Sequence, residues 1–136
     1  TANDRSGNKQ KQIKWKESDV IGNGSFGRVV LGLNLLTGEL MAVKQVHIGG
    51  LQSANAQERI KALELEVELL SKFKHKNIVR YIGTSRTKTT LNIFLEYISG
   101  GTIASLVKKY GKLNETLIRL YLKQILEGLE YLHARG

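Results

Sequence analysis

Three glycines, Gly22, Gly24 and Gly27, have the spacing G-x-G-x-x-G in the stretch IGNGSFGRV. Glycines allow backbone N–H groups to approach an anion closely, so the stretch could hold phosphates. Arg28 and Val29 replace the Lys and Ser or Thr of a P-loop, and strand-like sequence follows where a Rossmann turn opens into a helix. The stretch therefore predicts a strand–loop–strand hairpin, which either covers a nucleotide's phosphates or, taken alone, binds nothing.

A cation beneath such a hairpin would be supplied by Lys44, the charged residue of the apolar run MAVK. A buried ammonium needs an anionic partner. At 100° per residue, Glu66 projects from the middle of a broad apolar helix face, whereas Glu64 and Glu68 fall on the polar side. That face contains Ala62, Leu63, Leu65, Leu69, Leu70 and Phe73. We therefore predict a Lys44–Glu66 ion pair, the alternatives being a surface lysine and an exposed acid.

The elements that must position these residues alternate between strand-like and helical patterns. Strands are expected at residues 19–21, 28–33, 39–46, 78–84 and 91–97, and the first three are expected to form an antiparallel meander. Thr37-Gly38 predicts the tight turn of the meander, and residues 85–90 predict a polar turn between the last two strands.

Three helices complete the predicted pattern. The first spans residues 56–73, with Asn55 and Glu58 as a variant capping box. A short helix follows at residues 102–109, and Asn114 is expected to cap a longer helix that reaches His133. The longest helix is apolar on most sides, which indicates burial in a larger body.

The composition narrows the class of protein. The chain has 21 Lys and Arg against 12 Asp and Glu, a net charge of +9, and no Cys, which excludes disulfides and thiolate metal sites. Nucleic-acid binding is one reading of this charge, but much of it lies in a basic tail without interleaved aromatics, so a solvated surface is favoured and no specific nucleic acid is expected. No apolar run is long enough to span a membrane, and we expect a cytoplasmic fragment of a longer protein.

The motifs Gly22-x-Gly24-x-x-Gly27-x-Val29 and Ala42-Val43-Lys44, with Glu66 in the helix, resemble those of the protein kinase family. The resemblance implies an α+β fold: a kinase N-lobe, with a five-stranded antiparallel sheet and one long helix, followed by the first helices of a truncated C-lobe. Residues 1–13 would be a polar tail, 14–97 the N-lobe, and 98–136 the hinge and incomplete C-lobe. Lys44 would contact the α- and β-phosphates of ATP, and Glu66 would orient Lys44.

The resemblance also implies the remaining nucleotide contacts. Ile21, Val29 and Ala42 would enclose the adenine, Leu95 would be the gatekeeper, and the Glu96 carbonyl and Ile98 N–H would bond the base. The complete expected set is Ile21, Gly22, Asn23, Gly24, Ser25, Phe26, Gly27, Arg28, Val29, Ala42, Lys44, Leu95, Glu96 and Ile98.

Within the family, the stretches HKNIVRYIGT, FLEYISGGTIASLV and ILEGLEYLHARG are similar to those of mitogen-activated protein kinase kinase kinases. This similarity implies a serine/threonine kinase that uses ATP and Mg²⁺ to phosphorylate a MAP kinase kinase. None of His47, His75 and His133 is followed by Arg-Asp, and no Asp precedes Phe-Gly. We therefore expect the Mg²⁺ ligands to lie outside the fragment, which would be inactive alone. The alternative is a pseudokinase-like nucleotide-binding or scaffolding module.

Overall fold

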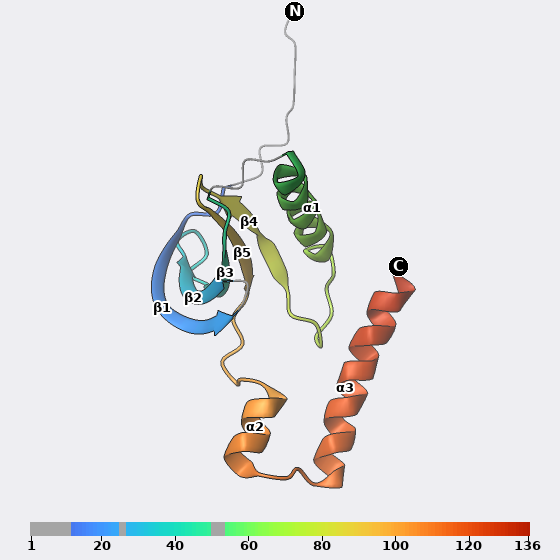
Figure 1. The fold of residues 1–136 in the computed structure, drawn as a ribbon. Coiled ribbons are helices and arrows are strands. Elements are labelled where there is room, and N and C mark those ends of the chain that lie inside the picture. Colours follow the sequence, from blue (N-terminus) through green and yellow to red (C-terminus); the bar gives the residue numbers. More distant parts are fainter. Residues whose placement is uncertain (1–11, 25–26, 50–53) are drawn as a thin grey trace, which may run out of the picture.

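The computed structural model describes residues 12–24, 27–49 and 54–136. Five strands form one antiparallel sheet with the order β1-β2-β3-β5-β4 (Figure 1). Their bounds are β1 Trp15–Gly24, β2 Gly27–Asn34, β3 Leu40–His47, β4 Tyr81–Arg86 and β5 Thr90–Glu96. The predicted meander is confirmed. Strand β4 begins later than predicted because Ile78 donates its N–H to the carbonyl of His75 in a turn.

The turn between β2 and β3 is built around Asn34, which is buried. Its side-chain oxygen accepts hydrogen bonds from the N–H groups of Leu36 at 2.9 Å and Thr37 at 3.2 Å. Gly38 has φ of +74°, a left-handed conformation that glycine adopts at little cost. The predicted turn at Thr37-Gly38 is therefore confirmed.

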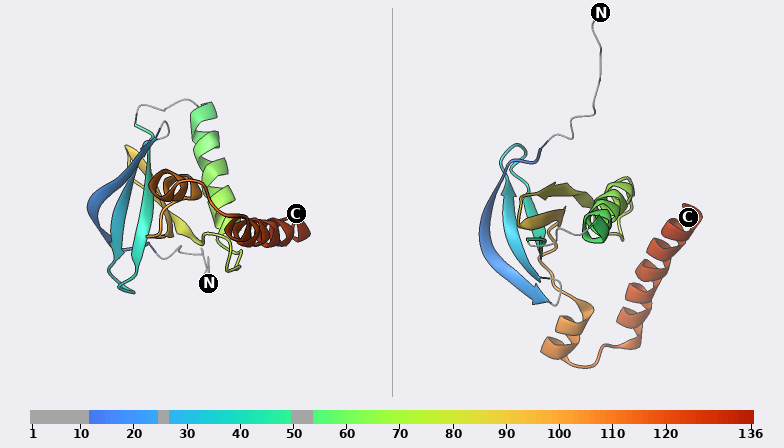
Figure 2. Two further views of the ribbon diagram at one scale, coloured as in Figure 1. Left: turned by 90° about the horizontal axis from the view of Figure 1, so that it is seen from below. Right: turned by 45° about the horizontal axis from the view of Figure 1, so that its top comes forward.

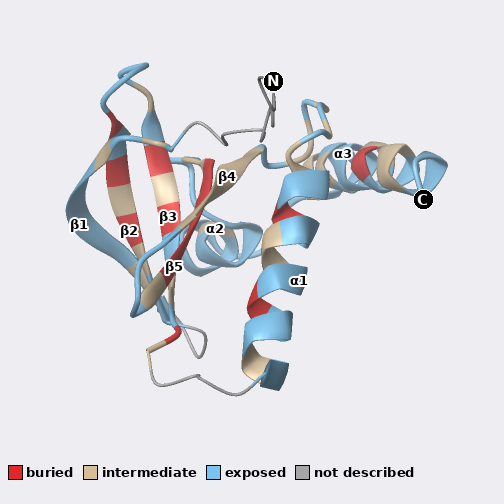
Figure 3. Cartoon of the chain, turned by 90° about the horizontal axis from the view of Figure 1, so that it is seen from above, coloured by how far each residue is buried: buried red, intermediate tan, exposed pale blue. Residues whose placement is uncertain are grey.

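Buried residues lie in the inner strands β2, β3 and β5 (Figure 3), and their apolar side chains form two clusters, one on each face of the sheet. On one face, Phe94 is completely buried and meets the Trp15 ring edge-on at 5.5 Å between centroids. The other residues of this cluster are Val30, Met41 and Val43. On the opposite face, the buried cluster consists of Ile48, Ile60, Val67, Leu91, Ile93 and Leu95, two of which come from helix α1.

Helix α1 spans Ala54–Leu70 and packs beside β4 (Figure 2). Asn55 is therefore inside the first turn, and the predicted capping box with Glu58 is wrong. The predicted apolar face is also wrong: Ile60 and Val67 are buried, whereas Glu66 is exposed, as are Leu65 and Leu69. The reason is that apolar and acidic residues alternate along LELEVEL, so leucines point to several sides of the helix.

Two further helices follow the sheet. Helix α2 spans Ile103–Tyr110, with Thr102 as N-cap, and helix α3 spans Glu115–Ala134. The predicted cap Asn114 is confirmed, since its side chain accepts the N–H of Leu117 at 2.9 Å. Gly128 is the buried residue of α3. Most of the apolar residues of this helix are exposed (Figure 3). Within the described ranges, no helix is long and apolar enough to cross a membrane.

Helix α3 touches the rest of the molecule through its second half. The Tyr131 hydroxyl accepts the N–H of Lys74 at 3.1 Å, and its ring lies 5.0 Å from the ring of His75. One turn earlier, the Glu127 carboxylate accepts a hydrogen bond from the side chain of Asn77 at 3.2 Å. These contacts attach α3 to the segment that precedes β4.

Candidate functional site

A cavity of about 400 Å³ lies under the hairpin that joins β1 to β2. The hairpin, β3, β5 and α1 all contribute to its wall. The lining residues are Gly22, Asn23, Gly27, Arg28, Val29, Lys44, Gln45, Val46, Leu63 and Ile93. The structure therefore brings Gly22 and Gly27 of the glycine motif and Lys44 to the wall of one cavity.

Gly27 is the glycine on which the close approach of the hairpin to β3 depends. Its φ is +129°, and a Cβ atom built on it would lie 2.1 Å from the carbonyl oxygen of Gln45. Any side chain would therefore force the two strands apart. Gly24 pairs with Gly27 across the hairpin, and the predicted site residues Ser25 and Phe26 lie outside the described residues.

Lys44 lies in the middle of β3, opposite Val29 on β2 and Ile93 on β5. Alternation along the strand puts its side chain on the same face as Ala42 and Val46, which pack against the α1 side of the sheet. Lys44 is exposed, and no carboxylate in the described part of the chain lies within 4.0 Å of its ammonium. The charge is therefore available to an anion in the cavity.

Glu66 does not form the predicted ion pair with Lys44 among the described side chains. On the surface of α1 it neighbours Leu63, three residues earlier, which lines the cavity. Glu66 is thus on the cavity side of α1 but is exposed to solvent.

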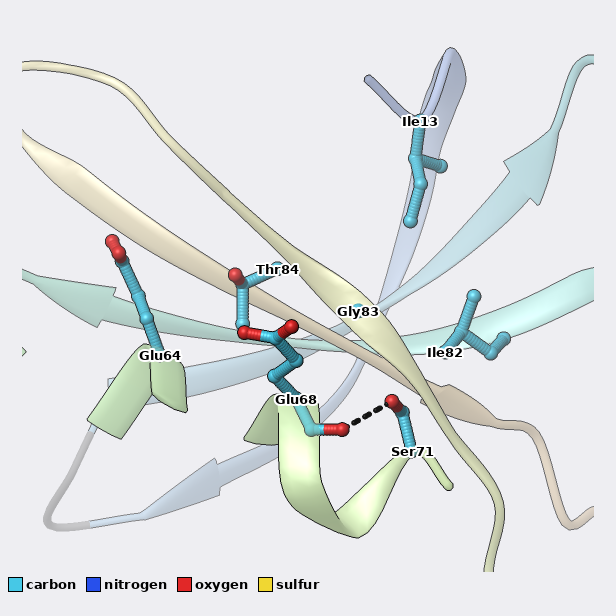
Figure 4. A pocket seen from close by; sticks show the side chains of 7 residues that line it. All are labelled: Ile13, Glu64, Glu68, Ser71, Ile82, Gly83 and Thr84. Carbon is cyan, nitrogen blue, oxygen red and sulfur yellow. Dashed lines mark hydrogen bonds between the residues drawn. The ribbon is translucent and has the colours of Figure 1, made fainter. Parts of the chain in front are cut away.

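Glu64 is half-buried and Glu68 is exposed, which agrees with a polar side of the helix, but this side lies beside β4 and does not face away from the sheet. They line a separate hollow together with Thr84 and Ile82 of β4 (Figure 4). The Glu64 carboxylate also lies 3.3 Å from Nε of Arg86, at the end of β4. This ion pair links α1 to the edge of the sheet.

The predicted adenine contacts are spread over a wider region. Val29 lines the cavity, and Ala42 pairs with Leu95, which is 8% exposed. Glu96 and Ile98 line a different hollow, which reaches α2 and α3. Ile21 is exposed and is not among the cavity's lining residues.

Four lining residues were missed by the sequence analysis: Gln45, Val46, Leu63 and Ile93. Gln45 and Val46 directly follow Lys44, so their position in the chain could have suggested them. Ile93 and Leu63 depend on the pairing of β3 with β5 and on the orientation of α1, and neither has a local signal. Among the described residues, no group of three or more His, Cys, Asp or Glu could hold a metal ion.

Comparison with known proteins agrees with this arrangement. The family model for the protein kinase domain matches residues 15–136. Mitogen-activated protein kinase kinase kinase 3 of Arabidopsis thaliana is 48% identical over 126 residues, covering 91% of this chain and 19% of that protein. Mitogen-activated protein kinase kinase kinase A of Dictyostelium discoideum is 47% identical over 125 residues, covering 91% of this chain and 13% of that protein.

The chain thus spans about a fifth of the length of the Arabidopsis relative. Among solved structures, the crystal structure of Rad53 1-466 in complex with AMP-PNP superposes with a TM-score of 0.75 at 27% identity. That match covers 90% of this chain and 31% of the other. With the family match over residues 15–136 and the five-stranded sheet that carries the glycine hairpin above Lys44, the chain belongs to the protein kinase family.

Proposed function

We propose that this chain is the ATP-binding part of a serine/threonine protein kinase of the mitogen-activated protein kinase kinase kinase type. The complete protein would transfer the γ-phosphoryl group of ATP to a hydroxyl group of a MAP kinase kinase. The observation that carries the proposal is the cavity in which Lys44 lies beneath the glycine hairpin. The names of the similar proteins support the type, and the AMP-PNP of the Rad53 complex, an ATP analogue, supports the nucleotide.

The residues of the cavity fit a polyphosphate. Gly27 lets the hairpin lie close to β3, and the Lys44 ammonium, which has no carboxylate partner among the described residues, can offset phosphate charge. Val29 and Ile93 provide apolar walls, and we assign Ala42, Leu95, Glu96 and Ile98 to the adenine. When bound, ATP supplies the phosphoryl group that is transferred. The family's Mg²⁺ ligands belong to motifs that this chain does not contain.

The proposal is tested with Lys44→Met in the full-length protein. We expect phosphoryl transfer to a MAP kinase kinase to fall by at least about 100-fold, because removal of one such charge or donor has effects of that order. The melting temperature should change little, since Lys44 is exposed and unpaired in the described structure. Lys112→Met, at an exposed lysine between α2 and α3, is the matched control.

Near-normal transfer by Lys44→Met would contradict the proposal. The scaffolding alternative predicts either that ATP with Mg²⁺ does not bind or that it binds without phosphoryl transfer. A titration of the unmodified protein with ATP and Mg²⁺, together with the transfer assay, distinguishes this alternative from the proposed kinase. A cytoplasmic location is part of the same proposal, because ATP and the downstream kinase would be met there.

Glu66 is proposed to orient Lys44 in the complete protein. The support is its place on the cavity side of α1, next to Leu63. We expect Glu66→Gln to lower kcat by about tenfold or more, by analogy with other lost charge-assisted contacts. Glu68→Gln is the matched control, because Glu68 lies on the same helix and faces β4 instead. Equal kinetic constants for the two variants would refute the proposed role of Glu66.

A further inference from the structure

A row of hydrogen-bonded polar side chains crosses all five strands of the sheet. We call it the polar ladder; its members are Glu17, Arg28, Gln45, Asn92 and Ser85, from β1, β2, β3, β5 and β4. Arg28 donates to Glu17 at 3.2 Å and to Gln45 at 2.7 Å. Gln45 donates to Asn92 at 3.3 Å, and Asn92 donates to the Ser85 hydroxyl at 3.5 Å.

The centre of the polar ladder borders the nucleotide cavity, because Arg28 and Gln45 are both among the residues that line it. Side chains alternate along a strand, so Gln45 shares a face with Val43, and Lys44 projects from the other. Arg28 pairs with Gln45 in the antiparallel register of β2 and β3. Arg28 also directly follows Gly27, the glycine that lies against the carbonyl oxygen of Gln45. Arg28 and Gln45 therefore lie at the base of the glycine hairpin and also beside Lys44.

The hydrogen bonds of the polar ladder run outward from Arg28, to Glu17 on one side and through Gln45 and Asn92 to Ser85 on the other. The Arg28 guanidinium can only donate, so the side-chain oxygen of Gln45 faces it and the amide nitrogen faces Asn92. Asn92 must then accept from Gln45 and donate to Ser85. A permanent cation at one strand thus sets the orientation of the amides on the next two.

Asn92 makes the polar ladder costly to break. It is 6% exposed and, with Asn34, is one of two buried polar residues in the described part of the chain. Its neighbour in the strand two residues on, Phe94, belongs to the apolar cluster of that face. A buried amide that loses its partners costs more than the bond itself is worth. Breaking the hydrogen bonds that link Arg28 of β2 through Gln45 to Asn92 of β5 is therefore costly.

We infer that Gln45 is a positioning residue that acts through the polar ladder. By joining Arg28 to the buried Asn92, it fixes the base of the glycine hairpin relative to Lys44 and so sets the affinity for ATP. This inference rests on the proposed function, because the hairpin and Lys44 are taken as the phosphate site. Gln45 itself need not touch the nucleotide.

The test compares three substitutions of Gln45 in the full-length protein, with KM for ATP and kcat measured for each. Gln45→Met keeps the side-chain length and removes both hydrogen bonds, so we expect KM for ATP to rise about three- to tenfold with kcat changed less than about twofold. Gln45→Glu still accepts from Arg28 and can accept from a reversed Asn92 amide, so it should recover most of that loss. Gln45→Lys places a second cation beside Arg28 and should raise KM most.

Two results would overturn the inference: an unchanged KM in Gln45→Met, or Gln45→Glu as impaired as Gln45→Met. A role in packing alone predicts the second result, because Met suits an apolar face better than Glu. If Gln45→Met does not fold, Arg28→Met removes the same link from a side chain that is 51% exposed, and an unchanged KM there is equally contrary.

A readout without nucleotide separates this inference from the proposed function. Amide hydrogen exchange in β1 and β2 of the ATP-free protein should be faster in Gln45→Met than in Gln45→Glu. If the unmodified protein does not bind ATP with Mg²⁺, the proposed function fails, whereas equal exchange rates in the two variants refute the polar ladder's control of the hairpin. Gln124→Met, at an exposed glutamine of α3, is the control for loss of an amide.

Discussion

The sheet with α1 and the pair α2 and α3 bury their apolar residues to very different extents (Figure 3). Phe94, Val30, Met41 and Val43 are completely buried in the sheet. In α3, a stripe with helical spacing is 43–51% exposed; it consists of Ile118, Leu122, Ile125 and Leu129. Both regions are rich in apolar side chains, so apolar content alone does not tell which region has a core of its own.

The difference is one of packing partners. The three inner strands β2, β3 and β5 each have a neighbour on both sides and contain buried side chains, and α1 covers the second face of the sheet. Helix α3 instead meets the rest of the molecule near Gly128 and Tyr131. The comparison predicts that substitutions in the sheet unfold the molecule, whereas substitutions in α3 change what it associates with.

Phe94→Ala is expected to give the largest effect. Replacing a buried Phe by Ala removes apolar contacts and leaves a cavity, at a cost of about 3–5 kcal/mol in the free energy of unfolding. Loss of the edge-on contact with Trp15 adds to this cost. Leu122→Ala, at a half-exposed leucine of α3, should change stability by less than about 0.5 kcal/mol. Urea unfolding measures both, and equal costs would refute the comparison.

The exposed stripe of α3 is expected to make the 136-residue chain self-associate, because contiguous apolar surface of this kind favours association. Leu122→Lys should weaken that association by about 1.5–3 kcal/mol, the value of one buried leucine side chain. Glu130→Gln changes the charge by the same amount away from the stripe and should leave association unchanged. Sedimentation velocity would decide, and a monomer at all concentrations would contradict the expectation.

Tyr131→Phe tests the attachment of α3 and is expected to give the smallest effect, because it removes a single hydrogen bond. The substitution removes the hydroxyl that accepts the Lys74 N–H but keeps the ring against Phe73 and His75. We expect a loss of about 0.5–1.5 kcal/mol, the usual net value of one hydrogen bond. Amide exchange at Lys74 should rise, with the sheet amides unchanged. Faster exchange throughout the sheet would show that α3 is part of the same cooperative unit.

Most of the fold could be predicted because its signals are local. Strand patterns, the turn at Thr37-Gly38 and the cap Asn114 each depend on a few neighbouring residues. The buried face of α1 could not be predicted, because the alternating pattern LELEVEL leaves no single apolar stripe and the sheet decides which side packs.

The site follows the same division. Gly27 and Lys44 could be assigned from motif and spacing, and the structure brings them into one cavity. The Lys44–Glu66 pair depends on the rotation of α1, which the sequence leaves open. The polar ladder depends on register across five strands, so its members carry no pattern that a reader of the sequence could find.

The two connections of the helix pair also have a mechanical consequence. One connection is the chain itself between β5 and α2, and the other is the contact of Tyr131 and Glu127 with the segment before β4 (Figure 1). Within the described residues, α2 and α3 do not pack extensively against each other, so each helix is held mainly by its own connection. We therefore expect α3 to turn about its contact with the segment before β4, and α2 to move with the chain that follows β5, without the two helices moving as one body.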